Sequence, residues 1–249
     1  MHGSRTFPMS HSDTHHEFPK TDWTRLLAAR EGGGSLDDAV RVYWSPVFAY
    51  LRRSGLASAD AEDLTQEFMA TVVLGRDLIG RADPDRARFR TFLKASLRNF
   101  LLDYHKSPTA RERRTAKPLG LPTDAPSAFP EPAASDTAET AFDRQWAAAL
   151  IDMALRRGEA YCEQAGMQLH WKLFRATTVD PLSGTSAAPP QADLARQFDV
   201  EPARAVEMIQ TARKVFRRMF KATVAETVAG ADQVDDELQR VLASLGIRS

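Results

Sequence analysis

The sequence predicts an all-α protein made of two small helical domains, joined by a proline-rich flexible linker and ending in a helix-turn-helix. Three observations lead to this prediction. Apolar residues recur at spacings of three and four along several segments, which is the period of one helix face. Alanine is abundant and glycine does not cluster as it does between strands, which favours helix. Five prolines fall between Pro118 and Pro132, a density that favours extended chain.

These patterns divide the chain into five parts. We expect a disordered tail over residues 1–20 and a first helical domain over residues 21–114. A linker over residues 115–140 leads to a second helical domain over residues 141–221, and an acidic C-terminal extension covers residues 222–249. No signal-peptide pattern and no long apolar run is present, which favours a cytoplasmic protein. The single cysteine, Cys162, excludes a disulfide framework and is most simply a small buried apolar residue.

Four helices are expected in the first domain. The first is capped by Thr21 or Asp22. The second starts at Ser35, and Pro46 further along permits a kink or the start of a new helix. The third follows Ser58 and has one apolar stripe, formed by Ala61, Leu64, Phe68 and Val72. The fourth has the clearest period in the chain, from Phe89 through Leu93, Leu97 and Phe100 to Tyr104, and a loop over residues 80–85 precedes it.

Charge is strongly segregated although the formal net charge is zero. Residues 60–67 are acidic, whereas residues 86–117 carry ten basic residues against two acidic ones. Residues 204–221 carry six basic residues against one, and the chain turns acidic again after Lys221. An acidic helix suits a basic protein surface and a cationic helix suits nucleic acid, so the two together indicate a protein that binds both.

Residues 191–221 have the pattern of a helix-turn-helix. A short helix with Leu194 and Phe198 is followed by a turn, and Pro202 suits the first turn of a longer basic helix. Many helical hairpins share this pattern, and a basic face on its own is also typical of a solvated helix. The basic run from Arg213 to Arg218 favours DNA binding.

Five short segments together resemble the extracytoplasmic-function type of bacterial RNA polymerase sigma factor. The string DAEDLTQEF, residues 60–68, resembles the segment of that family that binds core polymerase. The strings FRTFL and RNFLLDY, residues 89–93 and 98–104, resemble the helix that melts promoters. Residues 43–53 and 81–86 resemble a planctomycete-like subgroup. The resemblance is strong over about residues 22–114 and weaker over 141–221.

The resemblance implies three sets of site residues. The surface that binds polymerase would contain Asp60, Asp63, Gln66 and Glu67. The melting helix and its preceding loop would present Arg88, Arg90, Lys94, Arg98, Asn99 and Lys106 to DNA. The helix-turn-helix would use Arg204, Glu207, Thr211, Arg213, Lys214 and Arg217. Val206 and Met208 depart from the family, which commonly has basic residues at those positions.

The partners implied are core RNA polymerase and promoter DNA, with an anti-sigma factor or a kinase left open. We expect no catalytic residues, no cofactor and no metal. Two alternatives remain. One is a stand-alone helix-turn-helix regulator, which leaves the acidic helix unexplained. The other is a helical nucleotide hydrolase that binds magnesium through Asp63 and Glu67. Such a site needs a second acidic pair opposite the first, and the basic helix offers only Asp103. The charge of the acidic extension also suggests that it docks in cis on a basic surface.

Overall fold

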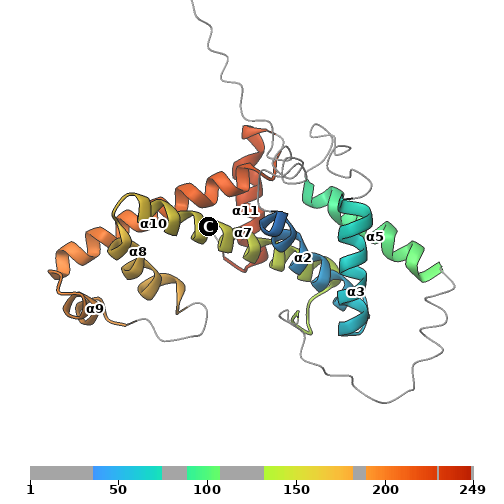
Figure 1. The fold of residues 1–249 in the computed structure, drawn as a ribbon, viewed down its shortest axis with the longest axis horizontal. Coiled ribbons are helices and arrows are strands. Elements are labelled where there is room, and N and C mark those ends of the chain that lie inside the picture. The colour runs from blue at the N-terminus through green and yellow to red at the C-terminus, as the bar shows by residue number, and fades with distance from the viewer. Residues whose placement is uncertain (1–35, 75–88, 107–131, 182–188, 229, 248–249) are drawn as a thin grey trace, which may run out of the picture.

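A computed structural model describes residues 36–74, 89–106, 132–181, 189–228 and 230–247. Every regular element in these ranges is helical, as the sequence predicted (Figure 1). The first group comprises α2 (Leu36–Arg53), α3 (Ser58–Phe68), the π-helix η1 (Met69–Leu74) and α5 (Phe89–Lys106). The second comprises α7 (Ala138–Gln164), α8 (Gln168–Phe174), the π-helix η2 (Arg175–Val179), α9 (Gln191–Gln197), α10 (Pro202–Ala225), the 3₁₀ turn η3 (Ala231–Gln233) and α11 (Val234–Ser244).

The apolar stripes form the buried faces of the first group. Helix α3 begins at Ser58 and buries Ala61, Leu64 and Phe68, as its period predicts. Helix α2 continues through Pro46 without a break. The helix expected near Asp22 and the loop over residues 80–88 lie outside the described residues.

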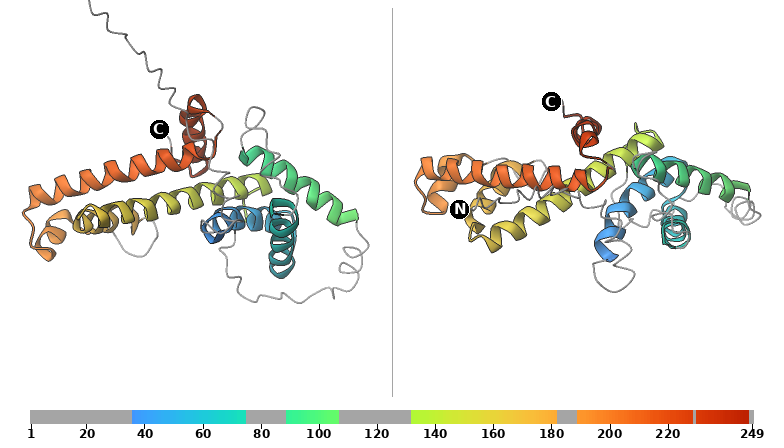
Figure 2. Two further views of the ribbon diagram at one scale, coloured as in Figure 1. Left: turned by 45° about the horizontal axis from the view of Figure 1, so that its top comes forward. Right: turned by 90° about the horizontal axis from the view of Figure 1, so that it is seen from above.

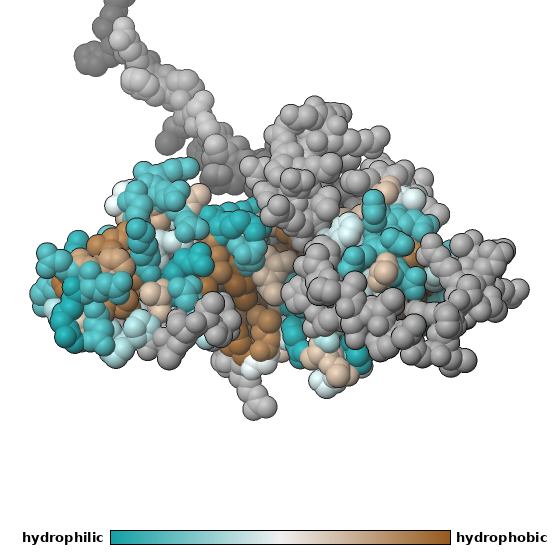
Figure 3. Space-filling model, turned by 60° about the horizontal axis from the view of Figure 1, so that its bottom comes forward, coloured by the Kyte–Doolittle hydropathy of each residue, from teal (hydrophilic) through white to brown (hydrophobic). Residues whose placement is uncertain are grey.

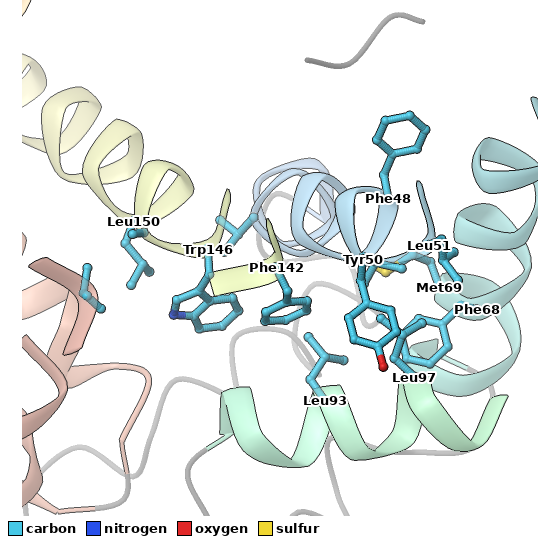
Figure 4. Packing of buried hydrophobic residues seen from close by; sticks show 14 of the residues in the cluster. Phe48, Tyr50, Leu51, Phe68, Met69, Leu93, Leu97, Phe142, Trp146 and Leu150 are labelled. Atoms are coloured by element: carbon cyan, nitrogen blue, oxygen red, sulfur yellow. The ribbon is translucent and has the colours of Figure 1, made fainter. Parts of the chain in front are cut away.

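Helix α7 joins the two groups of helices into one main core. Phe142 and Trp146 are fully buried, and the ring of Trp146 stacks on Tyr43 of α2 with centroids 5.5 Å apart. Figure 4 shows both side chains pointing from α7 into the same interior as Leu93 of α5 and Tyr50 of α2. The same core includes residues of α3, α10 and α11. The helices on either side of the expected linker therefore contact each other through this core.

The start of α7 is fixed by polar contacts inside the range expected to be linker. The Thr137 side chain caps the helix by accepting a hydrogen bond from the Thr140 backbone N–H. The buried carboxylate of Asp136 accepts one from Arg144 at 2.6 Å. The guanidinium of Arg53 donates to the backbone oxygen of Asp136 at 2.7 Å, which ties the end of α2 to this turn.

The second group has its own apolar contacts at the far end of the molecule. Leu173 of α8 packs with Leu194 of α9 and Ile209 of α10 in one cluster. Figure 2 shows the long helices α7 and α10 running alongside each other from the main core to this end. Arg157 of α7 donates two 2.7 Å hydrogen bonds to Glu226, which directly follows the last residue of α10.

The acidic extension is structurally continuous with the second domain. Helix α10 runs four residues beyond the expected boundary at 221, and Val224 is completely buried. Helix α11 then turns back, with Val241 in the main core and Leu238 and Leu242 packed against it. The acidic composition of this segment did not indicate that it packs on the core, because the apolar residues of α11 occupy only one face.

Gly158 in the middle of α7 provides a test of the α7–α8 contact. A Cβ at this position would stand 2.8 Å from Cζ3 of the Trp171 ring and closer still to Cη2. Gly158→Ala would stabilise an exposed helix by about 1 kcal/mol, but here we expect the overlap to destabilise the protein by ~1–3 kcal/mol. Urea unfolding of the two proteins measures this difference, and a variant more stable than the parent would contradict the observed packing.

Candidate polymerase-binding and DNA-binding surfaces

One face of α3 presents an acidic surface to solvent. Asp63, Gln66 and Glu67 are exposed and Asp60 is half-buried, while the opposite face of the helix is in the main core. Asp60, Asp63 and Glu67 follow at spacings of three and four, so they share one face. Carboxylates held this way on a rigid helix can pair with arginines and lysines of a partner protein.

Helix α5 has a buried apolar face and an exposed polar one. Leu93 and Leu97 are fully buried, whereas Arg98, Asn99 and Lys106 are exposed. This arrangement leaves two cations and one amide accessible to nucleic acid, as a phosphate- and base-contacting helix requires. Arg88, which belongs to the same predicted set, lies outside the described residues.

Two other predicted DNA contacts on α5 are turned inward. Arg90 is buried, with its guanidinium 3.2 Å from Asp143 of α7 and 3.3 Å from Glu237 of α11. Lys94 is half-buried and lies 3.0 Å from Asp143. The helical period predicted that both residues lie opposite the apolar stripe of α5. Asp143 of α7 and Glu237 of α11 meet them on that side, and the sequence of α5 does not show which other helices lie there.

An exposed leucine on α5 was not singled out from the sequence. Leu102 is 48% exposed and follows Asn99 by three residues, so it shares the exposed face. It belongs to an apolar run in the sequence, where its neighbour Leu101 is packed against the core. Only the contacts of the folded helix distinguish the two leucines.

Helices α9 and α10 form the predicted short helix, turn and longer helix. Asp199 in the turn has a φ of 52°, a left-handed conformation that aspartate tolerates better than most residues. The Glu201 side chain caps α10 by accepting from the Arg204 backbone N–H, and Pro202 occupies the first turn. This local geometry leaves the start of α10 at the molecular surface, where Arg204 and Glu207 are exposed.

The predicted recognition residues lie mainly on the exposed side of α10. Arg204 and Glu207 form a surface ion pair at 3.0 Å, and Thr211 is exposed one turn later. Lys214 and Arg217 are exposed, while Arg213 is half-buried. In Figure 3 hydrophilic residues cover much of this end of the molecule, interspersed with apolar patches.

The two departures from the family pattern on α10 have different positions. Val206 is 39% exposed on the outer side of the helix, whereas Met208 is buried against α8 and α9. Arg218, which was not among the predicted contacts, lies over the Tyr161 ring at 4.4 Å. This cation–π contact holds its guanidinium beside α7.

The isolated histidine and cysteine of the second group have structural environments. Burial, followed by the positive charge of Arg204, lowers the pKa of His170. Burial raises the pKa of the Cys162 thiol, which has no exposed surface. The sequence-based interpretation of Cys162 as a small buried residue is confirmed. Within the described ranges, no group of three or more His, Cys, Asp or Glu residues is arranged to hold a metal ion.

Comparison with known families identifies the first helical group. Residues 39–111 match the family described as sigma-70 region 2, a segment that includes most of α2 and all of α3, η1 and α5. This part of the chain is therefore similar to sigma-70 region 2. The match covers less than a third of the chain. No curated protein and no solved structure matches the chain.

None of the helices described is long and apolar enough to cross a membrane.

The burial of Cys162 leads to a simple chemical test. We expect the folded protein to react with a thiol reagent at least about 100-fold more slowly than the urea-unfolded protein, because an opening free energy of ~3 kcal/mol must be supplied first. Absorbance of the released aromatic thiolate measures both rates. Equal rates would mean that α7 and α8 do not enclose this residue in solution.

Proposed function

We propose that the protein is an alternative sigma factor of the extracytoplasmic-function type, in a planctomycete-like subgroup. It acts in the cytoplasm, where it binds core RNA polymerase and directs promoter recognition and DNA opening at the start of transcription. It contributes no catalytic step and requires no cofactor. The observation that carries this proposal is the exposed acidic face of α3 inside the matched region 2 domain.

The α3 face is suited to docking on the polymerase. Asp63 and Glu67 are exposed one turn apart on a helix that is anchored by the fully buried side chain of Phe68. Because the helix backbone is already ordered, pairing with a basic partner orders only the side chains of these carboxylates. Asp60 and Gln66 extend the same surface.

Helix α5 and the helix-turn-helix then supply the two DNA-binding parts. Arg98 and Lys106 are placed to contact phosphates, while the Asn99 amide can pair with the edge of an unstacked base. On α10, Lys214 and Arg217 would hold the phosphates of an upstream promoter element. Arg204, Glu207 and Thr211 would read its bases, with Arg213 as a further phosphate contact.

The helix-turn-helix geometry of α9 and α10 also fits a stand-alone DNA-binding regulator. That alternative gives the region 2 domain and its acidic face no role. Gel filtration with purified core enzyme separates the two, since only a sigma factor would elute together with the polymerase. In vitro transcription on a promoter library would then define the sequences recognised.

The first mutational test reverses one charge on α3. We expect Asp63→Arg to weaken binding to core polymerase by about 30-fold or more, which corresponds to ~2 kcal/mol for a lost interfacial charge pair. Fluorescence anisotropy of the labelled protein titrated with core enzyme measures the affinity. Glu163→Arg at the exposed end of α7 makes the same charge change and should bind normally. Similar affinities for both variants would remove α3 from the interface.

The second test separates base reading from phosphate contact on α5. Asn99→Ala should reduce discrimination between promoter and non-promoter DNA by ~1–3 kcal/mol, because it removes hydrogen bonds to a base edge. Arg98→Ala one position earlier should instead weaken binding to all sequences and make it less salt-dependent. Competition binding with polymerase holoenzyme at several salt concentrations measures both effects. Equal losses of specific and non-specific binding in Asn99→Ala would contradict the base-reading role.

A further inference from the structure

Two cations of α5 are neutralised by acids from the C-terminal half of the chain. Arg90 faces Glu237 of α11, whose side chain is only 1% exposed, and also faces Asp143 of α7. Asp143 additionally accepts hydrogen bonds from Lys94 at 3.0 and 3.1 Å. Both acids lie outside the region 2 match and far along the chain from α5.

Burial of Arg90 and Glu237 depends on the opposite charge that each provides for the other. An arginine stays protonated at all accessible pH values, so a buried guanidinium is tolerated only beside carboxylates. Glu237 is equally unsuited to burial without Arg90. The two groups therefore hold α11 against α5 as long as both are charged, and the Arg90 side chain is only 10% exposed to DNA phosphates.

The contact between α5 and α11 is made by side chains. The backbone of α11 packs mainly along α7 and α10, and α5 makes few close backbone approaches to the other described helices. Val241, which is fully buried, and the partly buried Leu238 and Leu242 seat α11 on the main core through apolar contacts. Withdrawal of α11 would therefore remove Glu237 from Arg90 without dismantling a backbone interface of α5, and Asp143 would remain as the other partner of Arg90.

The acidic face of α3 is left open by this contact. Asp63, Gln66 and Glu67 stay exposed while α7 and α11 cover the cations of α5. Figure 1 shows α2 lying between α11 and α3. The molecule thus offers its protein-binding surface and withholds part of its nucleic-acid-binding surface.

We propose that Glu237 and Asp143 form an autoinhibitory latch, which keeps Arg90 and Lys94 from nucleic acid while the polymerase-binding face stays accessible. The latched protein docks on polymerase, and strand opening requires that α11 leaves α5 and that the side chains of Arg90 and Lys94 turn away from Asp143, while the core around Phe142 stays packed. The proposal rests on the proposed sigma function of α3 and α5 and adds the regulation of that site.

The test uses a double variant of the full chain, Asp143→Asn with Glu237→Gln, which keeps side-chain shape and removes both latch charges. Its matched control is Asp152→Asn with Asp235→Asn, which removes two exposed acids from the same two helices. The probe is a short fluorescent single-stranded oligothymidine, with no polymerase present. We expect the latch variant to bind it more tightly than the control does. The slope of log affinity against log salt should steepen by about 1.4, or 0.7 for each newly available phosphate contact.

Hydrogen exchange of the same proteins reports the latch itself. We expect faster exchange in α11 of the latch variant alone, with the α2–α7 core still protected. Identical oligothymidine binding by latch variant and control would overturn the proposal. So would loss of protection throughout the core, because the pairs would then hold the fold together and not regulate it.

Binding to core polymerase separates this proposal from the one on which it rests. Wild-type protein and latch variant should bind the polymerase equally well, since the α3 face is unchanged. Failure of both to bind would reject the sigma function, while the exchange and oligothymidine results would still decide whether the cations are masked. A latch variant that binds polymerase at least tenfold better than wild type would overturn the claim that the docking face is already open.

Discussion

The packing of the first turns of α7 into the region 2 core is the constraint on which the rest of the structure depends. Phe142 and Trp146 fill the space between α2 and α5, and the stack of Trp146 on Tyr43 orients α7 relative to α2. Aromatic side chains of this size contribute several kcal/mol when buried, so they set the position of everything that follows in the chain. Helix α7 carries α8, α10 and α11 with it.

The position of α7 decides which charges are available on α5. Asp143 lies one residue after Phe142, so the ring that enters the core also brings a carboxylate to Lys94 and Arg90. The ring of Phe142 itself lies 5.8 Å beneath the Lys94 ammonium. Apolar packing and charge pairing therefore depend on the same turn of helix, and a change in one alters the other.

The two surfaces proposed to bind partners differ in how much they depend on the rest of the fold. The acidic face of α3 is fixed by its own buried stripe, whereas the cationic face of α5 is divided by distant elements into an open part and a covered part. Arg98, Asn99 and Lys106 are exposed, and Arg90 and Lys94 are paired. A protein built this way can recognise a protein partner and a nucleic acid at different stages.

The sequence by itself determined the helical class, the start of α3, the position of α5 and the short helix before α10, because periodicity, caps and turns are local properties. The burial of Cys162 followed from the apolar character of its side chain. It did not determine that α7 shares the region 2 core, that Arg90 is buried or that Leu102 is exposed. A helix shows which of its faces is apolar, but not which other helix will cover it or which distant acid will meet its cations. Those pairings join residues up to 147 positions apart, and only the tertiary structure decided them.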